Sequence, residues 1–153
     1  MRKSLILYSS LALLLGACKK DHNDGANSPN TWSLYGNTYQ ATTVTYLSYG
    51  NLTAASSGAT SSILMFQFST PPKNSGEMLI TDSGDPNTIV ITVSVATPGA
   101  GAFTSYISGK TNVKVNVAVN GKVSVSFPGS IWVHNISNYS DSTQLSAGTI
   151  TQQ

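Results

Sequence analysis

The sequence predicts an all-β protein, an antiparallel β-sandwich of about nine or ten strands. Two observations support this fold class. Short segments of alternating apolar and polar residues recur at spacings of about 8 to 12 residues, with turn-forming residues between them. Beyond the first segment of the chain, helical periodicity is absent, and Thr, Ser, Asn and Gly are abundant, as strands and turns require.

The first expected hairpin is "TWSLYGNTYQA". Gly36-Asn37 fits a two-residue turn with glycine in the first central position. This register sets Leu34 opposite Tyr39 and Trp32 opposite Ala41. The four side chains then share one face, which we expect to be the core face.

The segment "NVKVNVAVNGKVSVSFP" predicts a second hairpin. A three-residue loop, Val119-Asn120-Gly121, sets Val117 opposite Val123 and Val115 opposite Val125, with the glycine in the left-handed bulge position. A two-residue Asn-Gly turn would instead set apolar residues opposite polar ones. We therefore predict the three-residue loop, because a slip of one residue turns every side chain to the other face.

The other expected strands follow from the same alternation. Their number and their short links are compatible with a sandwich or with a closed barrel. We favour the sandwich. The alternative is an up-and-down barrel like that of lipocalins, because the position of Trp32 early in the domain weakly resembles the sequence of those proteins. The expected strands are "SILMFQFS" (62–69), "GEMLIT" (76–81), "TIVITVSV" (88–95), "AFTSYIS" (102–108), "IWVHN" (131–135) and "TQLSAGTITQ" (143–152).

Residues 1–17 have the layout of a secretory signal peptide. Arg2 and Lys3 precede an apolar stretch of eleven residues, 5–15, and two small residues follow it. The stretch is shorter than the roughly 20 residues that a membrane-spanning helix needs. We therefore expect cleavage rather than a transmembrane anchor.

The only cysteine of the chain lies directly after this stretch, in Leu15-Gly16-Ala17-Cys18. This motif resembles the lipobox of bacterial lipoproteins. The resemblance implies cleavage before Cys18, a diacylglyceryl group on its sulfur and acylation of its new amine. Two or more acyl chains hold a protein stably on a membrane, since each buried CH₂ contributes about 0.8 kcal/mol.

We expect residues 18–30 to form a flexible tether that begins with the lipidated cysteine, and residues 31–153 to form a single all-β domain. The charged "CKKDHND" after the lipobox resembles the export segment of surface lipoproteins of Bacteroidota. "TWSLYGNTYQA" and "LSAGTI" also resemble small lipoproteins of that group, a resemblance that implies no activity. These resemblances imply an outer-membrane lipoprotein. They favour the cell surface slightly but leave the periplasmic face open.

The charge of the chain excludes one class of partner. The formal net charge of +2 includes Arg2 and Lys3 of the signal, and without them six lysines balance six acidic residues. A neutral domain lacks the clustered basic face that nucleic acids require. We therefore expect no nucleic acid partner.

No motif indicates catalysis, a cofactor or a metal. His134 has no companion beyond His22 of the tether, and "DSGDPN" (82–87) fits a turn better than a calcium loop. Four acidic residues are available in the domain, and no serine lies in a Gly-x-Ser-x-Gly elbow. We therefore predict a protein that is not an enzyme.

The binding candidates are tyrosines. Tyr35, Tyr46 and Tyr49 fall off the expected core face, and exposed rings can stack on sugars or anchor a protein. "DST" (141–143) resembles the O-glycosylation motif of Bacteroidota, with Ser142 as acceptor. The expected function is a binding module for a glycan or an envelope protein. The alternatives are a structural or adhesive subunit that pairs through strand edges and a lipid-binding barrel.

Overall fold

The architecture comes from a computed structural model of the chain. It describes residues 29–58, 60–81, 85–96, 103–108, 111–118, 120–127 and 129–153. The expected signal peptide, Cys18 and the tether up to Ser28 lie outside these residues. Within the described ranges, no helix has the length and apolar character needed to cross a membrane.

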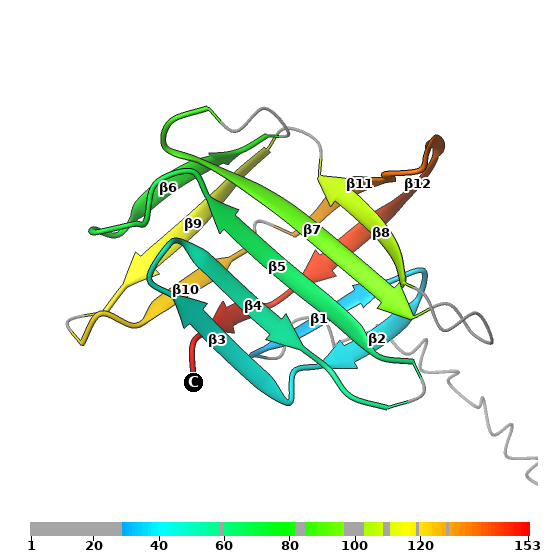
Figure 1. The fold of residues 1–153 in the computed structure, drawn as a ribbon, viewed down its shortest axis with the longest axis horizontal. Coiled ribbons are helices and arrows are strands. Elements are labelled where there is room, and N and C mark those ends of the chain that lie inside the picture. Colours follow the sequence, from blue (N-terminus) through cyan, green and yellow to red (C-terminus); the bar gives the residue numbers. More distant parts are fainter. Residues whose placement is uncertain are drawn as a thin grey trace, which may run out of the picture.

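The described residues form thirteen strands and no helix, and the strands join into one open, mixed sheet. One layer is an antiparallel run of four strands, which lie at the front in Figure 1. These strands are β3 (Thr43–Leu47), β4 (Asn51–Ala55), β5 (Ser62–Phe68) and β7 (Thr88–Ala96).

The other edge of β7 is shared by two branches of the sheet. The first part of β7 pairs with β6 and its last part with β8, so the sheet divides there and folds behind the front layer (Figure 1). One branch is β6 (Gly76–Ile80), β9 (Thr111–Val117), β10 (Val123–Ser126) and β13 (Thr149–Thr151). The other is β8 (Phe103–Ser108), β11 (Ser130–Asn135), β12 (Asn138–Ala147), β1 (Thr31–Leu34) and β2 (Asn37–Gln40).

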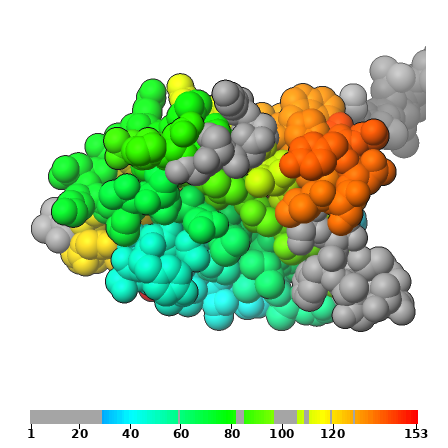
Figure 2. Space-filling model, turned by 45° about the horizontal axis from the view of Figure 1, so that its top comes forward, coloured from blue at the N-terminus to red at the C-terminus, as the bar shows by residue number. Residues whose placement is uncertain are grey.

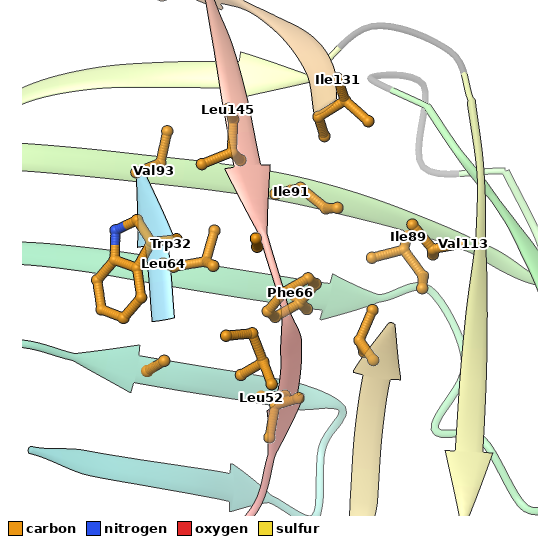
Figure 3. Packing of buried hydrophobic residues seen from close by; sticks show 14 of the residues in the cluster. Trp32, Leu52, Leu64, Phe66, Ile89, Ile91, Val93, Val113, Ile131 and Leu145 are labelled. Carbon is orange, nitrogen blue, oxygen red and sulfur yellow. The ribbon is translucent and has the colours of Figure 1, made fainter. Parts of the chain in front are cut away.

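The core lies between the front layer and the two branches. In Figure 3, Leu52, Leu64 and Phe66 of the front layer lie near Trp32 and Leu145 of the second branch. All five side chains are fully buried. A hydrogen bond also crosses the core, because Trp32 Nε1 donates to Ser62 Oγ over 3.0 Å.

The sandwich prediction is confirmed, and the alternative of a closed up-and-down barrel is wrong. The pairing path through the described strands ends at β2 and at β13, and β3 pairs only with β4, so the sheet stays open. The sheet is mixed rather than purely antiparallel because β6 and β7 run parallel. More strands are present than expected, partly because irregular residues divide long strands, as at Gly148 between β12 and β13.

Both hairpin predictions placed the core face correctly, but only one gave the right register. Val117 lies opposite Val123, and Val115 opposite Val125, as predicted, with Gly121 at φ 77°. In the first hairpin Trp32 lies opposite Tyr39. The turn there is Tyr35-Gly36, and both residues have positive φ.

This shift of the first turn keeps the predicted face. The turn starts one residue earlier than predicted, so the partner of each β1 residue moves by two positions and the parity of the strand is unchanged. The expected core residues Trp32, Leu34, Tyr39 and Ala41 are all buried.

Candidate functional site

The β11–β12 hairpin carries a cluster of exposed apolar and aromatic side chains. Ile131 and Val133 of β11 are buried, so Trp132 and His134, which alternate with them, point outward. The hairpin, drawn in orange in Figure 2, forms a lobe at one end of the molecule. We call Trp132, His134, Ile136 and Tyr139 the hairpin patch.

The pairing of β11 with β12 changes register within the hairpin patch. His134 pairs with Ser142, whereas the next residue, Asn135, pairs with Asn138. The Tyr139 ring then stacks on His134, with centroids 6.2 Å apart and an interplanar angle of 19°. Trp132 and Tyr139 are 56% and 64% exposed, which leaves flat ring surfaces open to a ligand.

Beneath the hairpin patch lies a hydrogen-bonded group that we call the tyrosine–aspartate cluster. The Tyr35 hydroxyl donates to Asp141 Oδ1. Asn135 Nδ2 donates to Asp141 Oδ2 over 2.9 Å, and the Tyr106 hydroxyl donates to the same oxygen over 3.4 Å. The Tyr35 and Tyr106 rings meet edge to face at 5.7 Å. The cluster thus connects the β1–β2 turn and β8 to the hairpin.

The cluster holds its carboxylate in the charged form. The hydrogen bond from Tyr35 is the main cause that lowers the pKa of Asp141, and the bond from Asn135 lowers it further. The same bond to Asp141 is the main cause that raises the pKa of Tyr35 well above its usual value. Asp141 is therefore engaged as an acceptor and acts as a connector between segments.

The three tyrosines predicted from the sequence do not form one site. Tyr35 is half exposed, but its hydroxyl belongs to the tyrosine–aspartate cluster. Tyr46 is partly buried and packs edge-on against Phe68, with ring centroids 6.2 Å apart. Tyr49 is 67% exposed in the β3–β4 turn, at the opposite end of the molecule from the β1–β2 turn (Figure 1).

Ser142, the residue of the predicted glycosylation motif, lies on β12 and is exposed. It pairs with His134, next to the hairpin patch. The neighbouring Asp141 belongs to the tyrosine–aspartate cluster. The motif therefore lies on an accessible strand, and its modification stays a prediction.

The acidic residues do not gather into a metal or catalytic centre. Among the described side chains, no group of three or more His, Cys, Asp and Glu comes within reach of one metal ion. Glu77 lies on β6 opposite Lys114 of β9, far along the sheet from Asp141. Residues 82–84 of "DSGDPN" lie outside the described residues.

A shallow pocket of about 420 Å³ lies near the loop before β6. Pro71, Pro72 and Met78 supply apolar surface, and Lys73 and Glu77 supply charges. We place the candidate site on the hairpin patch rather than on this pocket, because two large aromatic side chains, Trp132 and Tyr139, are exposed there.

The comparisons with known proteins do not add to this picture: no family model, no curated protein and no solved structure matches the chain.

Sequence reasoning did not identify Trp132, Ile136 and Tyr139 as candidate residues, and it considered His134 only for a metal or catalytic role. The alternation in "IWVHN" was a usable signal, because with Ile131 and Val133 inside, Trp132 must point outward. The contact between His134 and Tyr139 had no such signal, since it depends on the register shift after His134.

Proposed function

We propose that this protein is an outer-membrane lipoprotein, tethered through Cys18, whose β-sandwich is a non-catalytic binding module for glycans. The observation that carries the binding role is the hairpin patch. Its stacked rings and exposed indole are the kind of surface on which the apolar faces of sugar rings pack. Large aromatic side chains are also the usual anchors of binding sites.

Replacement of the exposed indole tests this role. We expect Trp132→Ala to weaken the affinity of the protein for immobilised glycans by about fivefold or more, since loss of an aromatic anchor costs more than about 1 kcal/mol. Leu79→Ala is the matched control, because Leu79 is 42% exposed on β6, outside the hairpin. Equal retention of both variants and the wild type would contradict the proposal.

The lipid anchor is supported by the lipobox resemblance and by the polar segment that follows it. Fractionation of cells tests it: the wild type should sediment with membranes and Cys18→Ser should not. Protease treatment of intact cells then distinguishes the two faces of the outer membrane. The domain is digested if it lies on the cell surface and protected if it faces the periplasm. Membrane association of Cys18→Ser equal to that of the wild type would refute the anchor.

A second candidate function is assembly through strand edges, which the open sheet favours. The pairing path ends at β2, whose sequence "NTYQ" has neither the charge nor the proline that usually protects an edge strand. If this function holds, the protein sediments as larger species when its concentration rises, and Thr38→Lys on β2 returns it to the monomer. A protein that stays monomeric at all concentrations excludes it.

A further inference from the structure

We propose that the ligand is an uncharged polysaccharide chain that runs from the hairpin patch across the front layer along one line of paired residues. This inference rests on the proposed glycan-binding function and specifies its ligand class.

The line follows the register of six strands. Thr45 of β3 pairs with Thr53 of β4, and Thr53 pairs with Met65 of β5. Met65 pairs with Thr92 of β7, which pairs with Ile107 of β8. Ile107 in turn pairs with His134 of the hairpin patch. We call this set the cross-strand row: Thr45, Thr53, Met65, Thr92, Ile107 and His134.

The cross-strand row lies on the outer face of the sheet. Its residues alternate along each strand with core residues, such as Ile91 and Val93 on either side of Thr92 and Leu64 and Phe66 on either side of Met65. Thr45 is exposed, and the other five are partly exposed. Hydroxyl, thioether and aliphatic groups are therefore presented side by side to the outside.

The length of the row indicates an extended ligand. Neighbouring strands lie about 4.8 Å apart, so five intervals between β3 and β11 span about 24 Å along the sheet. A single sugar ring would occupy only the hairpin patch at one end. A polysaccharide chain can contact the aromatic rings and continue over the row.

The charges of the protein exclude an acidic or basic chain as the preferred ligand. None of the outward positions of the front layer carries a charge among the described residues. The charged side chains that the structure describes lie elsewhere. Glu77 of β6 and Lys114 of β9 lie opposite each other on the first branch, and Asp141 is hydrogen-bonded in the tyrosine–aspartate cluster. A carboxylated chain would lose hydration on this face without gaining a cation. The outward positions beside the row are Thr43, Leu47, Asn51, Ala55, Ile63, Gln67, Val90, Ser94 and Ala96.

The test is affinity electrophoresis of the full chain in a mild nonionic detergent. The gels contain a neutral glucan, mannan, xylan or galactan, or an acidic polyuronate, and free disaccharides of the neutral polymers serve as short competitors. Thr92→Lys places a charge in the middle of the row. Thr151→Lys is the matched control, because Thr151 is a partly exposed threonine on β13, outside the front layer.

We expect at least one neutral polymer to retard the wild type more strongly than the polyuronate does. Thr92→Lys should lower the affinity for this polymer, obtained from the retardation, by about tenfold, which corresponds to about 1.4 kcal/mol. Thr151→Lys should leave it unchanged, and the disaccharide should compete only weakly with the polymer.

The outcomes separate this inference from the function on which it rests. If Trp132→Ala abolishes binding but Thr92→Lys does not weaken it, or if the disaccharide binds as tightly as the polymer, glycan binding stands and the row is wrong. Stronger retardation by the polyuronate also overturns the inference. If no polymer retards the wild type, the inference and the proposed function fail together.

Discussion

The hydrogen bond between Trp32 and Ser62 joins β1 to β5 across the core, and its removal gives a sharp test of the packing described above. In Ser62→Ala the Trp32 Nε1–H group keeps its buried position, with the indole fully buried and stacked on Tyr39 at 5.8 Å. The donor then lacks the Ser62 oxygen that lies 3.0 Å away. An unsatisfied buried donor costs about 1–3 kcal/mol.

We therefore expect Ser62→Ala to lower the free energy of unfolding by about 1–3 kcal/mol, a large share of the roughly 5–15 kcal/mol typical of a domain. Urea unfolding followed by circular dichroism measures this change. Ser124→Ala, on the outer face of β10, is the control and should change stability by less than about 0.5 kcal/mol.

A double-mutant cycle isolates the hydrogen bond from the packing. Trp32→Phe removes the donor, so the cost of Ser62→Ala in that background should fall by about 1 kcal/mol. A loss below about 0.5 kcal/mol for Ser62→Ala alone, or an equal loss in both backgrounds, would refute the reasoning.

Three further predictions concern the tyrosine–aspartate cluster and the turns. Tyr35→Phe removes the main cause of the lowered pKa of Asp141, so NMR titration of this carboxyl should give a pKa closer to about 3.9 in the variant; an unchanged value would mean that the bond is absent in solution. The pKa of Asp141 is lower in the folded state than in the unfolded state, so its contribution to stability is present above about pH 3.9 and is lost as the pH falls through the folded pKa. Thermal melts between about pH 6 and 3 should therefore show a smaller fall in melting temperature for Tyr35→Phe than for the wild type. Equal falls would contradict this reasoning. Gly50 has φ 105°, and a Cβ there would lie 3.1 Å from the carbonyl oxygen of Phe68, whereas Gly121 has φ 77° and open space. Gly50→Ala should therefore lower the melting temperature more than Gly121→Ala, with a cost of about 1–3 kcal/mol, and the opposite order would show that the turn relaxes.

The parts of the fold that local patterns determine were predictable. The valines of 113–125 alternate on both strands, so only one register puts them on a common face, and the structure has that register. In the first hairpin the alternation correctly predicted the core face. The glycine at position 36 suggested a Gly36-Asn37 turn, which is wrong. The positive φ of Tyr35 is accompanied by contacts with Tyr106 and Asp141, which are distant in sequence and leave no local signal.

The division of the sheet at β7 was also beyond local reasoning. The segments 76–81 and 88–95 each read as strands, and a short link between strands suggests a hairpin. They pair in parallel instead, through Leu79 with Thr88 and Ile80 with Ile89, while β6 finds its antiparallel partner in β9. Such non-local pairing depends on the whole sheet and cannot be derived from either segment.

The candidate site was predictable only in its kind. Exposed aromatic rings were expected, but the sequence pointed to tyrosines that the structure places at opposite ends of the molecule. Alternation alone identifies Trp132 as outward, whereas the stack of Tyr139 on His134 needs the irregular register of the hairpin. Side-chain contacts between two strands across an irregular register are therefore the part that sequence patterns miss.

The most direct measurement of the central claim is the tryptophan emission of the chain during titration with a neutral polysaccharide. Of the two tryptophans, Trp32 is fully buried and Trp132 is 56% exposed, so a ligand on the hairpin patch changes the emission of Trp132 alone. We expect a blue shift and protection from acrylamide quenching in the wild type, and neither in Trp132→Phe. A saturating ligand that leaves the Trp132 emission unchanged would contradict the claim that the hairpin patch is the binding site.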